Sequence, residues 1–594
     1  MNIPQFGTLR DLFTYSTTTY KNNNAFSYIN GQSYTYEEFG AKTSEVSDML
    51  ASYGVSPDDK IAILSQNMPN WPVAYFASTA FGRVSVPLLP DFSDFEIKNI
   101  IDHSEATALF ISQRLMYKVA EETLKTFKVV IDIDTLTPIR GSVTEQKAEI
   151  KTSSEEDLAV IIYTSGTTGN SKGVMLSHSN LCKHLYSACI LRPGFEWDVW
   201  LSLLPLSHTL ESSLCLLLPM ASGSKVYYIE KAPTPTILMN ALKESRPTTI
   251  LSVPMIIEKI YRNSVLPKFN ASPVTRTLYK TTFGRKLLNK VAGKKLMKTF
   301  GGNLRFFGIG GAKLDPEVER FLHEAKFPYA IGYGLTETSP LLAGAVVGKT
   351  KLQSTGPSVH GVTLKINNPN PETGEGEIVA KGPNVMMGYY KNPEATAQAF
   401  TEDGWFRTKD LGIFDKEGRL FIKGRLNNMI LGPSGENIYP EEIESIINGH
   451  SMVAESLVTL YDGKLVALVH FNPDKLKSLI EAKDEAIAAY YKTKDELKHS
   501  YDEKKEEIIK AYEEKKEEFS KTKDDLMQSY DEKKEEVMKA FHEKLDHLKK
   551  EVYDYVNARV NKFSKINVVV DHPEQFEKTA THKIKRYKYT NKAK

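Results

Sequence analysis

The residues with the clearest chemical role form a loop between Thr164 and Lys172. Its sequence, Thr164-Ser-Gly-Thr-Thr-Gly-Asn-Ser-Lys172, combines two glycines, several hydroxyl side chains and one ammonium group. Glycines let successive backbone N–H groups converge on an anion, hydroxyls add donors, and a lysine adds charge for outer phosphates. The spacing is not that of a Walker A loop. The residues predicted to bind phosphate are Thr164, Ser165, Gly166, Thr167, Thr168, Gly169 and Lys172.

Two local conformations are compatible with the sequence of this loop. An apolar run, Leu158–Ile162, precedes it and a helical pattern follows it, so we expect a strand-to-helix loop. A flexible Ser/Thr/Gly connector is the alternative. That alternative explains neither the buried strand before the loop nor the Lys-Gly pair after it.

Further motifs follow the loop in a fixed order. They are Leu204-Pro-Leu-Ser-His-Thr-Leu-Glu211, Phe307-Gly-Ile-Gly-Gly-Ala-Lys313, Tyr333-Gly-Leu-Thr-Glu-Thr-Ser339, Gly404-Trp-Phe-Arg-Thr-Lys-Asp410 with Gly424-Arg425, and Glu577-Lys-Thr-Ala-Thr-His-Lys-Ile-Lys-Arg586. Together with the loop they resemble the adenylate-forming superfamily of acyl-CoA synthetases, firefly luciferases and peptide-synthetase adenylation domains. The resemblance covers nearly the whole chain apart from a Lys/Glu-rich segment, and the order of motifs is more specific than any one of them.

The resemblance implies a role for each residue that matches a family motif. His208 would lie near the substrate carboxylate, and Gly310, Gly311 and Ala312 would bring backbone close to the adenine and the acyl carbonyl. In the motif that contains Gly334, Tyr333 would lie against the adenine, Thr336 on the α-phosphate, and Glu337 would bind magnesium. Asp410 would bind the ribose hydroxyls, Arg425 the phosphate or ribose, Asn427 would be the hinge, and Lys583 the catalytic lysine.

Each of these residues also has a simpler interpretation. His208 beside apolar residues is typical of a core histidine, Glu337 of an exposed loop carboxylate, and Lys583 of a basic tail. Two positions depart from the family pattern: the hinge holds Asn427 where Asp or Lys is common, and His582 replaces a common glycine.

The resemblance predicts an enzyme that uses ATP and Mg²⁺ to join a carboxylic acid to AMP, releasing pyrophosphate. The acyl group then passes to the thiol of coenzyme A, a co-substrate, and AMP is released. The motifs look most like those of long-chain fatty acyl-CoA synthetases, which predicts a fatty acid as substrate. The alternatives are transfer to acyl carrier protein or another acceptor, and a coiled-coil interaction protein with an inactive adenylation domain.

These residues need a scaffold, and the apolar runs indicate an α/β fold. Runs at 60–67, 106–112, 128–134, 157–164 and 248–254 are typical of strands buried on both faces, hence of parallel-type sheets. A β-rich stretch with glycine-marked hairpins follows. We predict a large adenylate-forming domain at 1–425 and a small, mobile α+β domain at 426–594, with a hinge near 427.

The Lys/Glu-rich segment predicts an insertion in the small domain. Between Pro473 and Pro573 there is no glycine or proline, and apolar residues recur in steps of eleven, which keeps each row on one helix face. Both ends must return to one domain, so we predict an antiparallel coiled-coil hairpin at 480–548 with its tip near 520–524. A charged, partly disordered helix is the alternative. The inserted segment could serve oligomerisation, partner docking or membrane contact, and the sequence does not choose among them.

The overall composition limits the partners. The chain has 594 residues, a net charge of +2 and three cysteines without C-x-x-C spacing, so we expect no nucleic-acid partner and a reducing cytoplasm. The N-terminus lacks a signal pattern, and no apolar run is long enough to span a bilayer. The stretch 276–298 is basic with interspersed apolar residues. Peripheral contact with an anionic membrane fits it, although an ordinary solvated helix pair fits better.

Overall fold

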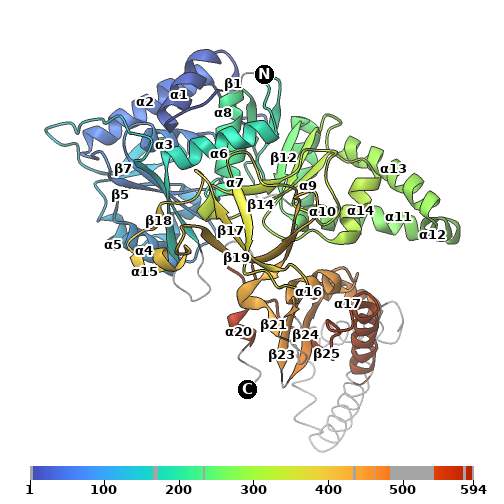
Figure 1. The fold of residues 1–594 in the computed structure, drawn as a ribbon. Coiled ribbons are helices and arrows are strands. Elements are labelled where there is room, and N and C mark those ends of the chain that lie inside the picture. The colour runs from blue at the N-terminus through green and yellow to red at the C-terminus, as the bar shows by residue number, and fades with distance from the viewer. Residues whose placement is uncertain are drawn as a thin grey trace, which may run out of the picture. The chain divides into compact units, whose positions relative to one another are not determined.

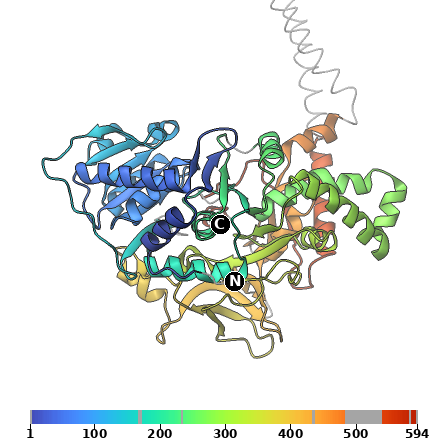
Figure 2. The same ribbon diagram turned by 90° about the horizontal axis from the view of Figure 1, so that it is seen from above.

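The protein folds as two compact units. A computed structural model describes residues 4–164, 171–231, 234–431, 437–461, 463–481, 539, 541–579 and 583–590. The first unit comprises Met1–Asn427 and Lys578–Lys585, and the second comprises Asn428–Glu577 and Arg586–Lys594. The chain therefore passes between the units three times. Figures 1 and 2 show the ribbon in two views.

Sheet B, the first of two eight-stranded sheets in the first unit, carries the predicted phosphate loop. Its order is β18-β9-β8-β4-β3-β5-β6-β7, parallel in the centre and antiparallel at the edges. The strands are β3 (Lys60–Leu64), β4 (Val84–Leu88), β5 (Ala106–Ile111), β6 (Val129–Asp132), β7 (Thr137–Gly141), β8 (Leu158–Thr164), β9 (Lys172–Ser177) and β18 (Gly388–Tyr389). Continuous burial of β3, β4 and β6 explains why their sequences are apolar runs rather than alternating patterns.

Sheet A has the order β15-β14-β13-β12-β10-β11-β1-β2 and carries three of the other motifs. Its strands are β1 (Asn24–Tyr28), β2 (Ser33–Thr35), β10 (Val199–Leu201), β11 (Lys225–Tyr228), β12 (Thr249–Ser252), β13 (Phe306–Ile309), β14 (Tyr329–Gly334) and β15 (Leu341–Gly344). Neighbouring strands from β1 through β14 are parallel, and β2 and β15 pair antiparallel at the edges. Motif residues therefore follow the carboxyl ends of parallel strands, where ligands commonly bind in such sheets.

Helices cover both sheets, and helix and sheet side chains together form three apolar clusters. The largest cluster joins side chains of both sheets to α1 (Leu9–Thr19), α2 (Tyr36–Ser52), α3 (Asn70–Thr79), α6 (His178–Leu191) and α8 (Leu218–Ser222). The second joins sheet A to α9 (Pro235–Ser245), α10 (Pro254–Ile260), α13 (Thr282–Thr299) and α14 (Pro316–Glu324). The third joins sheet B to α4 (Asp94–Ser104) and α5 (Glu121–Leu124). Such burial is the main source of stability in a large domain.

A four-stranded antiparallel sheet completes the first unit. Its order is β16 (Thr363–Asn367), β17 (Gly376–Lys381), β19 (Phe406–Phe414) and β20 (Leu420–Arg425). The turn between β19 and β20 closes with the N–H of Gly418 donating to Asp415 O at 3.0 Å, and Gly418 has a φ of +73°, which favours glycine. The predicted hairpins of this β-rich stretch are confirmed.

The second unit is a small α+β fold with its own core. It contains β21 (Ile430–Leu431), β22 (Asn437–Ile438), α16 (Pro440–Asn448), β23 (Val453–Tyr461), β24 (Lys464–Phe471), α17 (Pro473–Glu481), a helix over 541–557, β25 (Val568–Asp571) and α20 (Tyr587–Thr590). β23 and β24 are antiparallel, and β25 adds in parallel to β24. Leu545, Leu548, Val552 and Val556 from the 541–557 helix enter the core.

The α/β fold class predicted from the sequence is confirmed. The predicted hairpin at 480–548 lies largely outside the described residues, which resume at 539 and continuously from 541. That hairpin therefore stays a prediction, as do its tip near 520–524 and its eleven-residue rows.

Candidate active site

The predicted phosphate loop connects two antiparallel strands of sheet B. β8 ends at Thr164 and β9 begins at Lys172, and these two residues pair in register. The expectation of a strand-to-helix loop is wrong, because the apolar segment after Lys172 pairs with β8 before α6 begins. Thr164 and Lys172 thus close a hairpin, while Ser165, Gly166, Thr167, Thr168 and Gly169 lie outside the described residues.

Lys172 is linked to Glu337 through Tyr389. The Lys172 ammonium lies over the Tyr389 ring, 4.9 Å from its centroid, and the Tyr389 hydroxyl donates to Glu337 Oε1 at 2.9 Å. Burial and the nearby Glu337 carboxylate raise the pKa of Tyr389, so its hydroxyl stays a donor. The pairing of β18 with β9 places Tyr389 there. An ammonium and a carboxylate from distant segments thus share one aromatic side chain.

The turn that holds Glu337 is fixed by close backbone contacts. Glu337 is the second residue of η4 (Thr336–Thr338), between β14 and β15. A Cβ on Gly334 would lie 1.9 Å from Pro340 O, so only glycine fits there. The buried Asn384 amide donates to Thr338 O at 2.7 Å and clamps the turn from outside. The carboxylate therefore projects from a rigid segment.

Tyr333, Asp410 and Arg425 form a second connected group. The Tyr333 hydroxyl donates to Asp410 Oδ2 at 2.7 Å, and Arg425 Nε lies 2.7 Å from Asp410 Oδ1. The register of β19 against β20 pairs Asp410 directly with Arg425. Burial raises the pKa of Asp410 and the Arg425 charge opposes that rise. Strand pairing thus joins Asp410 to Arg425, and a side-chain hydrogen bond from another sheet joins Tyr333 to them.

The Lys583 ammonium belongs electrostatically to the same group. Its segment, Lys578–Lys585, is part of the first unit, and an isolated bridge between Lys578 and Ile584 closes it as a small loop. Lys583 is exposed to solvent, yet the protein atoms packed around it and the Arg425 charge lower its pKa, while the charges of Asp410 and Glu337 oppose that shift. Lys583 thus lies in the field of both carboxylates, where positive charge can meet an anionic ligand.

His208 and the glycines after β13 approach each other from two strands of sheet A. His208 caps α7 (Thr209–Glu211): its Nδ1 accepts from the Leu210 N–H at 3.2 Å. Burial and the Lys583 charge lower the pKa of His208 to about 4, so the ring is neutral near pH 7. A Cβ on Gly310 would lie 3.5 Å from Leu210 Cδ2, and Gly311 has a φ of +85°. The turn Gly310-Gly311-Ala312 therefore faces the motif that contains His208.

Glu211 ends that motif as a fully buried carboxyl group. Ser202 donates to Glu211 Oε1 at 2.6 Å, and burial raises the pKa of Glu211 to about 7. A π-helix over Ser212–Leu217 follows directly. Such helices are rare and often occur at functional sites.

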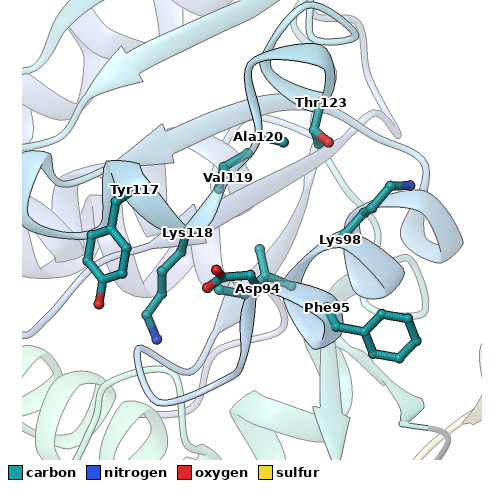
Figure 3. Close-up of a pocket in the computed structure, with 9 residues that line it drawn as sticks. Asp94, Phe95, Lys98, Tyr117, Lys118, Val119, Ala120 and Thr123 are labelled. Atoms are coloured by element: carbon teal, nitrogen blue, oxygen red, sulfur yellow. The ribbon is translucent and has the colours of Figure 1, made fainter.

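One surface hollow lies apart from these residues. It has a volume of about 290 Å³ between α4 and the segment that links η1 (Gln113–Lys118) to α5, and Phe95, Lys98, Tyr117 and Lys118 are among its lining residues (Figure 3). No predicted site residue lines it. The candidate site is therefore defined by its hydrogen bonds and charges rather than by this hollow.

The chemistry of the site fits Mg²⁺. The described residues contain no group of three or more His, Cys, Asp or Glu side chains that could hold a metal alone. Magnesium, however, is usually held by one or two carboxylates together with substrate phosphates and water. Glu337, on the turn fixed by Gly334 and Asn384, is a carboxylate that could take part in such a site.

Sequence reasoning missed Tyr389 and Asn384. Neither lies in a motif noted above, and both act through contacts with residues about fifty positions away. The Gly388-Tyr389-Tyr390 segment reads as an ordinary strand end. Only its pairing with β9 reveals the contact to Lys172.

The comparisons with known proteins identify the family. Residues 13–390 match the model of the AMP-binding enzyme family, which is more than half of the chain. The chain therefore belongs to the AMP-binding enzyme family.

Curated relatives align over most of the chain. The long chain acyl-CoA synthetase 7, peroxisomal, of Arabidopsis thaliana is 28% identical over 79% of this chain and 74% of its own length. The long-chain-fatty-acid–CoA ligase FadD15 of Mycobacterium bovis is 30% identical over 69% and 72%. The long-chain-fatty-acid–[acyl-carrier-protein] ligase AEE15, chloroplastic, of Arabidopsis thaliana is 28% identical over 72% and 70%.

A solved structure supports the same fold. ATP-bound MatB from Rhodopseudomonas palustris superposes with a TM-score of 0.70 at 21% identity, covering 98% of this chain and all of that chain. At this identity the likeness concerns the fold alone. None of the described helices has the length and apolar character needed to cross a membrane.

Proposed function

We propose that this protein is an acid–thiol ligase that uses ATP to activate a long-chain fatty acid and passes the acyl group to coenzyme A. The observation that carries the proposal is the cluster of Tyr333, Asp410 and Arg425 beside Glu337 and Lys583. The names of two relatives, a long chain acyl-CoA synthetase and a long-chain-fatty-acid–CoA ligase, supply the substrate class. Membership of the AMP-binding enzyme family supports ATP as the nucleotide substrate.

The first step is chemically demanding because both reactants are anions. A carboxylate oxygen attacks the α-phosphorus of ATP, the bond from that phosphorus to the bridging oxygen of pyrophosphate breaks, and acyl-adenylate forms. Charge repulsion dominates this barrier, so positioning and neutralisation are the main catalytic tasks. Lys172 and Lys583 supply positive charge, and Asp410 accepts hydrogen bonds from the ribose.

Mg²⁺, held by Glu337, would neutralise phosphate charge. Tyr389 positions Glu337 for that task through its hydroxyl. His208 lies beside the acyl group. Because its ring is neutral, it does not form an ion pair with the carboxylate of the fatty acid. Tyr333, with Gly334 and the turn 310–312, encloses the adenine, and Thr336 donates to the α-phosphate.

The second step transfers the acyl group. The coenzyme A thiol loses its proton, and the sulfur attacks the acyl carbon. The bond between the acyl carbon and the phosphate oxygen of AMP breaks, and AMP leaves. The proposal includes rotation of the small domain about Asn427, which withdraws Lys583 and admits the thiol. No protein side chain needs to act as a covalent nucleophile.

Acyl carrier protein is the second candidate acceptor. One relative is a long-chain-fatty-acid–[acyl-carrier-protein] ligase, at an identity similar to that of the CoA ligases. An inactive adenylation domain is less well supported, because Lys172, Glu337, Asp410, Arg425 and Lys583 are all present.

The proposal also covers location and contacts. We place the protein in the cytoplasm, where free cysteines are stable: Cys182, Cys189 and Cys215 are free and buried. Contact with membranes occurs at the surface, and the 480–548 arm is the proposed site for a partner or a second copy.

A turnover assay tests the function. Pyrophosphate release is measured across fatty acids of increasing chain length with coenzyme A, with holo acyl carrier protein, and with neither. We expect sustained release only with long-chain acids and coenzyme A. Release that requires carrier protein would select the second candidate, and no release with any acid would leave the inactive-domain interpretation.

The variant Lys583→Ala separates the two steps. We expect acyl-adenylate formation to fall by roughly 10²–10³-fold because an electrostatic contact is lost, while thiolysis of preformed acyl-adenylate is retained. Lys585→Ala, two residues away in the same segment, is the control and should leave both steps within about twofold. Normal adenylate formation in Lys583→Ala would refute the assignment of Lys583.

A further inference from the structure

The helices that connect β12 to β13 form an unusually basic part of the chain. Residues 259–314 contain thirteen lysines and arginines and no aspartate or glutamate. They include the last two residues of α10 and all of α11 (Leu266–Asn270), α12 (Pro273–Lys280) and α13. In both ribbon views the light-green helices α11–α13 lie at the end of the first unit farthest from its blue N-terminal segments (Figures 1 and 2). The charge is therefore concentrated at one end of this unit.

The inner face of α13 is firmly attached to α14. Gly293 approaches Ala325 so closely that a Cβ would lie 2.7 Å from Ala325 O. Arg285 Nη2 lies 2.9 Å from Glu324 Oε1, and the Asn289 amide donates to Glu324 Oε2 at 2.7 Å. The orientation of α13 is thus fixed, and its opposite face must point outward.

That outer face is apolar as well as basic. Phe283 is 80% exposed and Val274 of α12 is 75% exposed, and Leu287 and Val291 are also exposed. Phe283, Leu287 and Val291 are four residues apart, so they form one stripe along the helix. Surface apolar side chains are usually scattered, and a continuous stripe commonly marks an interaction site.

Lysines border the stripe. Lys286, Lys290 and Lys294 each follow a stripe residue by three positions, which places them along its edge, and all three are exposed. Within α12 and α13, the exposed basic residues that make no ion pair in the described part of the chain are Arg276, Lys280, Lys286, Lys290, Lys294, Lys295 and Lys298. Their charge is free to meet an anionic partner.

We propose that the outer face of α12 and α13 docks the protein on an anionic lipid membrane. Apolar side chains flanked by lysines suit the boundary between headgroups and acyl chains, where the rings and methyls insert and the ammonium groups reach the phosphates. A nucleic acid or an acidic protein would match the charge alone and would leave Phe283 and Leu287 without a role. The inference deepens the proposed membrane contact by naming its surface. It rests on the proposed function only in that a long-chain acid and its thioester partition into bilayers.

Vesicle binding by the full-length chain tests this surface without ATP or coenzyme A, so its outcome is separate from that of the turnover assay. The probes are vesicles of phosphatidylcholine alone and vesicles with about 30% phosphatidylserine, at about 0.1 M and 0.5 M salt. We expect binding only to the phosphatidylserine vesicles and weaker binding at high salt. Equal binding to both, or to neither, would overturn the proposal.

Variants locate the surface and distinguish the partner. Lys286→Gln/Lys290→Gln/Lys294→Gln should lower the association constant by roughly tenfold to a hundredfold, and Phe283→Ser/Leu287→Ser by at least about tenfold. Lys349→Gln/Lys351→Gln/Lys416→Gln, three exposed lysines elsewhere in the first unit, is the matched control and should bind normally. Thermal unfolding of each variant checks that it is folded.

Two results would overturn the inference. If the lysine triple variant binds as tightly as the unchanged protein, another part of the chain holds the membrane. If Phe283→Ser/Leu287→Ser has no effect and duplex DNA competes as strongly as vesicles, the surface is a general polyanion site.

Discussion

Glu211 shows how burial can outweigh hydrogen bonding in setting the behaviour of a residue. Its side chain is fully buried, and desolvation raises its pKa from 4.5 to about 7. Between pH 4.5 and about pH 7 the Glu211 carboxyl group therefore stays protonated in the folded protein, whereas it is ionised in the unfolded chain. The contribution to stability is complete below about pH 4.5 and is lost as the pH rises through 7, by about 3 kcal/mol in all.

Glu211→Gln tests this directly. The amide cannot ionise, so the variant should gain stability relative to the unchanged protein by about 2–3 kcal/mol between pH 5 and pH 8.5. Urea unfolding at both pH values, followed by tryptophan fluorescence, measures the difference. Glu372→Gln, at an exposed carboxyl, is the control. An equal difference at both pH values for Glu211→Gln would contradict the assigned titration.

The candidate site was predictable residue by residue but not as a set of contacts. Tyr333, Glu337, Asp410 and Arg425 each lie in a motif that the sequence reveals. The hydrogen bond from Tyr333 to Asp410 depends on two sheets meeting, which no local pattern encodes. The contacts of Tyr389 are also non-local, because they depend on the pairing of β18 with β9 within sheet B.

At the scale of elements, hydrophobicity predicted β3, β5, β6, β8 and β12, but it singled out neither β4 in the centre of sheet B nor β9 next to its edge. The runs that became β3, β5, β6, β8 and β12 are buried on both faces, so hydrophobicity marks them clearly. β9 was missed because it is a six-residue strand between a loop and a capped helix. The short apolar segment before α6 read as part of the helix.

The packing of α13 on α14 gives an element-scale prediction. Gly→Ala within a helix normally stabilises by about 1 kcal/mol. At Gly293 the new methyl would meet the Cβ and the carbonyl oxygen of Ala325, each at 2.7 Å, so the helices must shift. Gly293→Ala should therefore destabilise the first unit by about 1–3 kcal/mol in urea unfolding.

Lys294→Ala is the neighbouring control for that variant. Its side chain is exposed, and the change should stay within about 0.5 kcal/mol. A stabilised Gly293→Ala would mean that α13 and α14 are packed less tightly than their contact at Ala325 implies.

At the scale of the molecule, the boundary between the units falls between Asn427 and Asn428, within η5 (Leu426–Asn428). A proline there locks φ near −65° and removes a backbone N–H. If the small domain rotates about this point during the cycle, Asn427→Pro should affect the two half-reactions unequally. We expect the rates of adenylate formation and thioester formation to fall by factors that differ at least about tenfold.

Separate assays of the two half-reactions measure that ratio. Asn427→Ala removes the same side chain while keeping backbone freedom, so it should behave as the unchanged protein does. Parallel losses in both half-reactions of Asn427→Pro would count against a hinge at this position.

The segment Lys578–Lys585 belongs to the first unit although both of its neighbours belong to the second. Genetic recombination at residue 427 would consequently not exchange self-contained halves. A hybrid built there would inherit the contacts among Tyr333, Asp410 and Arg425 from one parent and the Lys583 ammonium from the other. The two parents' sequences would have to be compatible around Asp410 and Arg425 before such a hybrid could turn over.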